Sequence, residues 1–196
     1  MIGFIKEHSY DIFKLFLTQI AIAILGLVLA FSTSSNSLLF LVSSLFSAFF
    51  YFCLLYSEGW ELGAKDRPRI TNGRLKFDPL KGARLSLFSN SINIILVLVL
   101  FISLILGSKS GAGIGAFGSL YAIVWYIQRT ISAMFMGINS YFSPVNMVDG
   151  MKFIVPDSIY HPIFYLVTII PSIVSVALGY YMGANDRKLL TVNASK

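Results

Sequence analysis

The stretch IILVLVLFISLIL, residues 94–106, decides the fold because its only polar residue is Ser103. A lipid bilayer has a hydrocarbon core about 30 Å thick, and a helix of about 20 apolar residues crosses it. Extended upstream, the apolar stretch covers Leu85–Leu106 and is long enough for this crossing. The sequence therefore predicts an integral membrane protein built from α-helices.

The composition of the whole chain agrees with this prediction. Of the 196 residues, 56% are hydrophobic and 12% are charged, whereas roughly a quarter of the residues of a soluble domain are charged. A soluble globular protein and a disordered chain are therefore excluded. The chain has one cysteine, Cys53, and two histidines, which excludes an intrachain disulfide and a zinc site of the usual spacing. We expect no metal and no other cofactor.

Other apolar segments predict further spans, at Leu15–Phe31, Leu38–Tyr56 and Ile159–Met182. A weaker candidate, Phe117–Ile138, holds Gln128 and Arg129 near its centre, where an arginine costs about 2.5–3.5 kcal/mol. We expect this segment to span the membrane or to re-enter it. The sequence thus predicts an all-α integral membrane protein with a single domain over residues 1–196. Its bundle has about five transmembrane helices, or four true spans if the segment 117–138 is re-entrant.

The basic residues predict the orientation, because loops rich in lysine and arginine stay in the cytoplasm. The segment Ser57–Arg84 holds seven of the 15 basic residues, and Lys6 and Lys14 precede the first span. We therefore expect a multi-pass protein of the plasma membrane whose N-terminus and 57–84 loop are cytoplasmic. Five spans would place the C-terminus outside. Arg187 and Lys188 follow the last span and favour the inside, which four spans would satisfy.

Within the loop, Asn72-Gly73 is a strong hairpin signal because both residues tolerate a positive φ. We expect a small β-hairpin or a tight loop on the membrane face. One interpretation is that the basic residues of the loop only fix the orientation. Another is that they bind anionic lipid headgroups, through Lys65, Arg67, Arg69, Arg74 and Lys76. A third is that Leu75 and Phe77 dock a partner protein; nucleic acid is not expected, because no aromatic stacking platform interleaves with the charges.

Polar residues inside spans are candidate functional residues, because each is costly in lipid. Ser86, Ser89, Asn90 and Asn93 share one face of the third predicted span. Counted from the cytoplasmic end of each helix, Asn93, Arg129 and Gln19 lie at similar depths of roughly 10–13 Å. We therefore predict a polar site that binds an anionic ligand, made of Arg129, Gln128, Asn93, Asn90 and Gln19. The alternative is a structural network of interhelical hydrogen bonds.

Three acids, Glu58, Glu61 and Asp66, cluster where the second predicted span leaves the membrane. Glu58 and Glu61 share a helix face. The simplest interpretation is a set of interfacial acids that bridge to Lys65 or Arg67. The alternative is a paired-carboxylate catalytic site or a divalent-metal site, although the acids lack a recognised metal-binding spacing.

Two stretches, WELGAKDRPRITNGRLKFDPLKG (60–82) and LGYYMGANDRKLL (178–190), resemble segments of small, uncharacterised polytopic membrane proteins of Gram-positive bacteria. This resemblance implies a bacterial plasma membrane and carries no known activity.

The function we expect is that of a non-enzymatic membrane component. It would be an accessory or substrate-capturing part of a transport or membrane-assembly system, in contact with membrane lipids and other membrane-protein subunits. One alternative is a lipid-active enzyme at the cytoplasmic interface that uses Glu58, Glu61 or Asp66, with basic residues holding a phosphate. The sequence lacks the dense His, Asp and Glu cluster that such chemistry normally needs. A second alternative is a purely structural partner for other helices.

Overall fold

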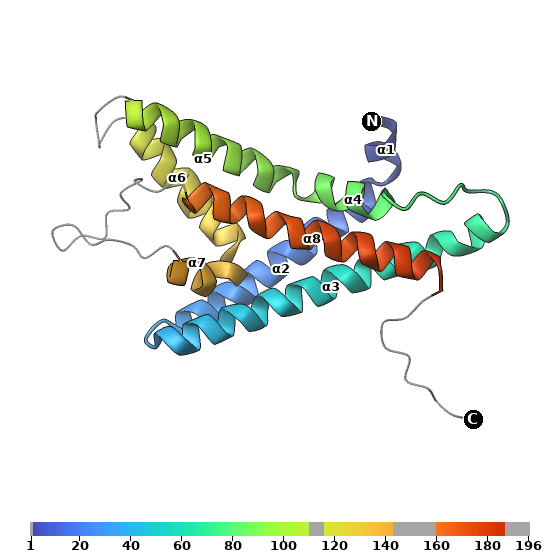
Figure 1. Cartoon of the computed structure of the whole chain (residues 1–196), viewed down its shortest axis with the longest axis horizontal. Helices are drawn as coiled ribbons and strands as arrows, with labels where there is room; N and C mark the ends of the chain where they lie inside the picture. Colours follow the sequence, from blue (N-terminus) through green and yellow to red (C-terminus); the bar gives the residue numbers. More distant parts are fainter. Residues whose placement is uncertain (1, 110–115, 143–159, 187–196) are drawn as a thin grey trace. The chain divides into compact units, whose positions relative to one another are not determined.

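The computed structural model describes residues 2–109, 116–142 and 160–186, and within these residues every regular element is helical (Figure 1). The elements are α1 Ile2–Glu7, α2 Ser9–Thr33, α3 Ser37–Thr71, α4 Lys81–Ser89, α5 Ser91–Lys109, α6 Ala116–Ile131, the 3-10 helix η1 Ala133–Phe135, α7 Met136–Phe142 and α8 Tyr160–Ala184. The predicted all-α class is confirmed. Arg187 and Lys188, which bear on the side of the C-terminus, lie outside the described residues.

Three helices in the described part of the chain are long and apolar enough to cross a membrane: Ser9–Thr33, Ser37–Thr71 and Pro162–Ala184. The pair of α4 and α5 adds a fourth if it is counted as one broken span. The third predicted span, Leu85–Leu106, is therefore not one continuous helix, because it is interrupted at Asn90. Large apolar side chains such as Phe31 and Phe49 are exposed, as side chains that face lipid would be. The structure thus supports a membrane-embedded protein with three to four candidate spans.

The chain divides into two compact units. The first unit is made of Met1–Phe16, Phe52–Ser89 and Ile170–Lys196, and the second of Leu17–Tyr51 and Asn90–Ile169. Three helices, α2, α3 and α8, contribute residues to both units.

In the second unit, α5 and α6 run side by side as an antiparallel pair (Figure 1). Their contact is apolar and aromatic, and Tyr165 of α8 joins it. The buried residues of this core are Val97, Leu100, Tyr121, Val124, Trp125 and Tyr165. The same unit holds the turn between α2 and α3, where the Asn36 side chain accepts hydrogen bonds from the amides of Leu38 (3.0 Å) and Leu39 (3.3 Å). Asn36 therefore caps the start of α3.

The segment Phe117–Ile138, predicted to span the membrane or to re-enter it, is not one continuous helix, because α6 ends at Ile131 and η1 and α7 follow. The Ser44 hydroxyl of α3 lies at this break, where it donates to the Met134 carbonyl at 2.8 Å and accepts from the Ile138 amide at 3.3 Å. A Cβ atom added at Gly26 of α2 would lie 2.6 Å from the Met134 nitrogen. The break is thus packed closely against the other helices of the unit, which satisfies backbone groups that a helix would otherwise pair.

Replacing Ser44 by alanine should lower the free energy of unfolding by about 2 kcal/mol, because one buried and one partly buried backbone group lose their partner. Thermal or denaturant unfolding in mild detergent measures this loss. The matched control is Ser175→Ala, because Ser175 is more exposed and its hydroxyl bonds only the Pro171 carbonyl of its own helix. Equal stabilities of the two variants would mean that Ser44 does not support the break.

In the first unit, α8 lies against the C-terminal part of α3 at a stripe of glycines (Figure 1). Gly59 and Gly63 of α3 face α8, and Gly179 and Gly183 of α8 face α3. A Cβ atom at Gly63 would fall on the Tyr180 carbonyl oxygen and 2.6 Å from the Ala184 nitrogen. The two backbones are therefore as close as small-xxx-small pairs allow.

The predicted loop 57–84 is shorter than expected, because α3 continues through its first half to Thr71. The hairpin is not formed, and within the described residues there is no β-strand. Gly73 has a φ of +68°, whereas Asn72 does not have a positive φ. The Gly73 amide donates to the Ile70 carbonyl and the Arg74 amide to the Arg69 carbonyl. Asn72-Gly73 therefore forms a tight turn that ends a helix, where a glycine with positive φ is favoured.

Candidate functional site

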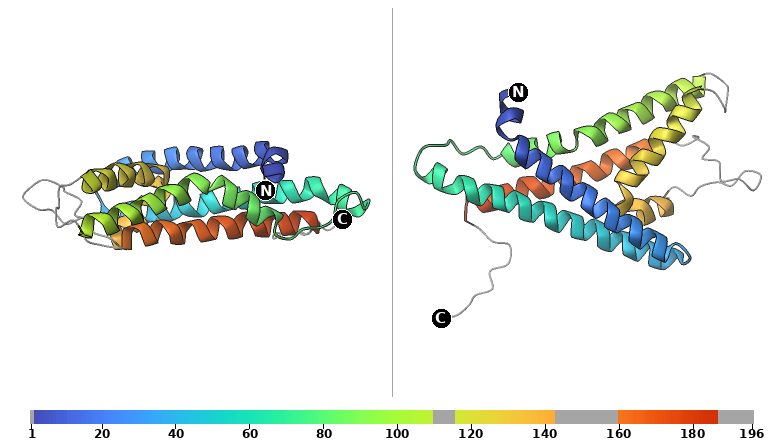
Figure 2. Two further views of the ribbon diagram at one scale, coloured as in Figure 1. Left: turned by 90° about the horizontal axis from the view of Figure 1, so that it is seen from above. Right: turned by 180° about the vertical axis from the view of Figure 1, so that it is seen from behind.

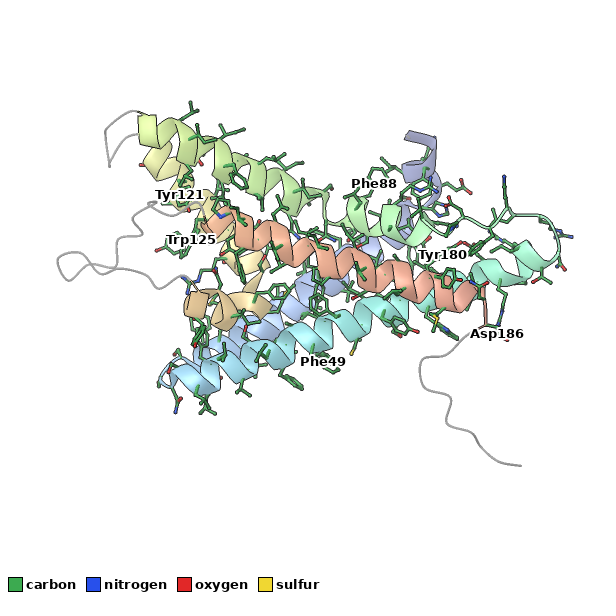
Figure 3. All side chains as sticks on the ribbon, in the orientation of Figure 1. Phe49, Phe88, Tyr121, Trp125, Tyr180 and Asp186 are labelled. Atoms are coloured by element: carbon green, nitrogen blue, oxygen red, sulfur yellow. The ribbon has the colours of Figure 1, made fainter. Side chains whose placement is uncertain are left out.

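The most buried charges of the first unit form a network around Asp66 of α3. One carboxylate oxygen of Asp66 accepts hydrogen bonds from Nζ of Lys81 at 2.7 Å and from the hydroxyl of Tyr180 at 2.9 Å. Tyr180, which projects from α8 (Figure 3), is 0% exposed, and the side chains of Lys81 and Asp66 are 12% and 10% exposed. A buried charge is costly unless it is paired and hydrogen-bonded, and this network meets both needs.

The glycines explain how residues from α3, α4 and α8 reach one another. Gly63 and Asp66 are three residues apart and lie on the same side of α3. The close contact at Gly63 brings the Tyr180 backbone against α3. A Cβ atom at Gly82 of α4 would lie 2.7 Å from Cβ of Tyr180, which sets Lys81 next to the same residue. The glycines thus position the buried network.

A second ion-pair group joins α2 to α3. Glu61 accepts hydrogen bonds from Lys14 at 2.7 Å and from Lys65 at 2.8 Å. At 35 residues α3 is longer than the roughly 20 residues that cross a bilayer core, and Glu61 lies beyond its apolar part. The hydrogen bonds from Lys14 and then from Lys65 lower the pKa of Glu61 to about 2. The expected bridge between Glu61 and Lys65 is formed.

A cavity of about 420 Å³ opens beside the Asp66 network. Residues of α1, α2, α3 and α4 surround it. Figure 2 shows α1 turned away from the axis of α2 at this end of the first unit. The cavity is lined by Glu7, His8, Asp11, Leu62, Lys65, Asp66, Arg69 and Lys81. Seven of these eight residues are ionisable, and the three carboxylates balance the three Lys and Arg cations.

Most charges of the lining are already paired within the protein. His8 contacts Asp11 at 3.4 Å, Lys81 contacts Asp66, and Lys65 contacts Glu61. Two charges of the lining have no ion-pair partner among the described residues: Glu7 at the end of α1 and Arg69 near the end of α3. Both side chains are exposed and are available to a ligand.

The basic residues predicted to contact lipid or a partner have different positions in the structure. Lys65 and Arg69 line the cavity. Arg67 forms an ion pair with Asp186. Arg74 and Lys76 are exposed in the segment that follows α3. Of the three acids considered for catalysis, Asp66 lines the cavity, while Glu58 and Glu61 do not.

The polar residues predicted to gather around Arg129 belong to the second unit. The Arg129 guanidinium lies 4.8 Å from the centre of the Trp125 ring, a cation–π contact. Gln128 donates to Ser132 at 3.2 Å, and Asn93 donates to Asn90 at 3.2 Å. Among the contacts of the described residues, none joins Arg129 to Gln128, Asn93, Asn90 or Gln19.

Three of these amide side chains are nevertheless deeply buried. Gln19, Asn93 and Gln128 are 3%, 4% and 1% exposed, and each keeps a buried oxygen without a hydrogen-bond partner within the described residues. This burial does not measure the predicted depth in the membrane, which stays a prediction. Their mutual contact with Arg129 stays a prediction.

No family model, curated protein or solved structure matches the chain. Within the described residues, no group of three or more His, Cys, Asp or Glu side chains could hold a metal ion. The choice of a function therefore rests on the geometry and charge of the cavity.

Five residues of the cavity lining and of the Asp66 network were not among the predicted site residues: Glu7, His8, Asp11 and Lys81 of the lining, and Tyr180, which bonds Asp66. The N-terminal acids precede the first apolar span, and Tyr180 is one of several tyrosines near the ends of spans. The signal that could have found Tyr180 is the pair of glycine motifs, Gly59-xxx-Gly63 and Gly179-xxx-Gly183, which predicts that α3 and α8 cross closely.

Proposed function

We propose that this protein is a non-enzymatic, polytopic protein of the plasma membrane that captures a small ionic ligand in the cavity of its first unit. It would act as an accessory or substrate-capturing component of a transport or membrane-assembly system. The observation that carries the proposal is the cavity of about 420 Å³ with seven ionisable residues in its lining. Ligand pockets commonly measure about 300–1,000 Å³ and use a few fixed polar groups for specificity.

The state of the charges favours capture over catalysis. Asp66 is the buried carboxylate of the lining, and it already accepts two hydrogen bonds, from Lys81 and Tyr180. Because both donors bind the same carboxylate oxygen, the geometry favours a structural role for this carboxylate over proton transfer. The same network fixes the wall of the cavity in advance, so that little ordering is required when a ligand binds.

The proposed setting is a bundle of about five membrane helices, or of four true spans if the segment 117–138 re-enters the membrane. The N-terminus and the end of α3 would face the cytoplasm, since the basic residues concentrate there. The exposed cations Arg74 and Lys76 would then lie near anionic lipid headgroups, worth about 1 kcal/mol for each basic residue. The cavity would open at the same side of the membrane.

The test is a thermal-unfolding screen of the purified full chain in mild detergent. The probes are inorganic phosphate, glycerol 3-phosphate, glycine and glycerophosphoethanolamine. We expect at least one probe to raise the unfolding temperature, because a ligand at 100 times its Kd stabilises the folded state by about 2.7 kcal/mol.

The effect should vanish in Arg69→Gln and persist in the control Arg74→Gln, which removes an exposed cation outside the cavity lining. Native mass spectrometry of the same samples would detect a lipid that binds in place of these probes. The proposal is wrong if neither the binding of a probe nor the retention of a lipid depends on Arg69.

A further inference from the structure

We infer that the ligand of the cavity is a zwitterion with a phosphodiester and an ammonium group, the chemistry of a phosphoethanolamine headgroup. The phosphate would bind at Arg69 and the ammonium at Glu7. This inference rests on the proposed function and names the ligand class for the same cavity.

The charge balance of the lining is the first argument. Glu7, Asp11 and Asp66 offset Lys65, Arg69 and Lys81. A ligand with a net charge, such as inorganic phosphate or a simple amine, would leave an excess charge in the cavity. A phosphodiester joined to an ammonium carries one charge of each sign, so that it leaves the cavity neutral.

Two charges of the lining, those of Glu7 and Arg69, are still available to a ligand. Lys81 and Asp66 neutralise each other inside the lining, and Asp11 contacts the His8 ring at 3.4 Å. Glu7 and Arg69 have opposite charges and no ion-pair partner in the described part of the chain. A ligand that satisfies both must present an anion and a cation together.

Two neighbouring cations on α3 indicate which kind of anion binds. Lys65 and Arg69 are four residues apart on α3 and therefore lie on one face of the helix. Lys65 is 59% exposed although it contacts Glu61, so its ammonium can still reach a ligand. Two neighbouring cations suit the spread oxygens of a phosphate, which an arginine can grip with two parallel hydrogen bonds. One carboxylate, that of Glu7, suits one ammonium.

The experiment places the full chain in nanodiscs that contain equal amounts of phosphatidylethanolamine and phosphatidylglycerol. The protein is then released from the nanodiscs, and native mass spectrometry identifies the lipids that it retains. We expect the wild type and the control Lys6→Gln to retain phosphatidylethanolamine about tenfold better than phosphatidylglycerol. Lys6 neighbours Glu7 on α1 but does not line the cavity. Glu7→Gln should bring this ratio close to one, and Arg69→Gln should lose both lipids, with unfolding temperatures near that of wild type.

A competition arm separates the two sources of this headgroup. Glycerophosphoethanolamine that displaces the lipid, or binds alone to the detergent-solubilised protein, would identify a soluble ligand; lack of competition would identify the lipid. Either result supports the zwitterion. Arg69-dependent retention of phosphatidylglycerol as strong as that of phosphatidylethanolamine would overturn the zwitterion and leave ligand capture standing. If no ligand depended on Arg69 for binding, both the zwitterion inference and the proposed ligand capture would be overturned.

Discussion

Replacing Gly63 by alanine should lower the free energy of unfolding by about 3 kcal/mol, the upper part of the range for overpacking a well-packed contact. The added methyl group would fall on the Tyr180 carbonyl oxygen and 2.6 Å from the Ala184 nitrogen. Both are backbone atoms, so no side-chain rotation can relieve the clash. The two helices must move apart, which also draws the Tyr180 hydroxyl away from Asp66. Thermal unfolding in detergent, with circular dichroism as the readout, measures the effect.

The control is Gly3→Ala, because a Cβ atom at Gly3 meets nothing within 4 Å. Gly3 lies inside α1, where alanine is favoured over glycine by roughly 0.5–1 kcal/mol. The two variants make the same chemical change in two helices. If Gly63→Ala were as stable as Gly3→Ala, the close crossing of α3 and α8 would be contradicted.

The long apolar helices could be predicted from the sequence because burial in lipid selects composition, and composition is visible in the chain. The breaks between helices could not be predicted from the sequence. At the interruption between α6 and α7, the Met134 carbonyl is bonded by Ser44, which is 90 residues away in the chain. No periodicity within 117–138 encodes that partner. The turn at Asn72-Gly73 was recognised by its tolerance of positive φ, but the same tolerance serves a hairpin and a helix end alike.

The candidate site was predictable only in part. Charge density marked Lys65 and Arg69, which line the cavity, together with Arg67, which instead pairs with Asp186. The cost of polar groups in lipid singled out Gln19, Asn93 and Gln128 as residues that turn inward, and all three are buried. Counting depth along each helix carried no information on direction. The structure places the Arg129 guanidinium against Trp125, and its contact with the buried amides stays a prediction. The contribution of Glu7 depends on the way α1 packs, for which the short N-terminal sequence has no pattern.

Removing the carboxylate of Asp66 should have the largest effect of any single charge. In Asp66→Ala the Lys81 ammonium, 12% exposed, and the buried Tyr180 hydroxyl both lose their acceptor. Breaking a buried ion pair from one side costs about 3–5 kcal/mol, because the remaining charge is left without compensation. We therefore expect a loss of that size in detergent unfolding. The exposed pair of Arg67 and Asp186 supplies the contrast: Asp186→Asn should cost less than about 1 kcal/mol, and asparagine tolerates the φ of 56° at this position.

A second substitution, at Lys81, separates the cost of an ammonium group without a counter-ion from the cost of the lost packing. Adding Lys81→Met to Asp66→Ala removes the uncompensated ammonium and keeps a side chain of similar length. The double variant should recover more than half of the lost stability, because the desolvation of an unpaired cation is the main cost of the single change. Arg69 and Glu7 remain in the double variant, so a zwitterion should still bind, although less tightly. If the double variant were no more stable than Asp66→Ala, the carboxylate would act through Tyr180, and the ion pair with Lys81 would contribute nothing to stability.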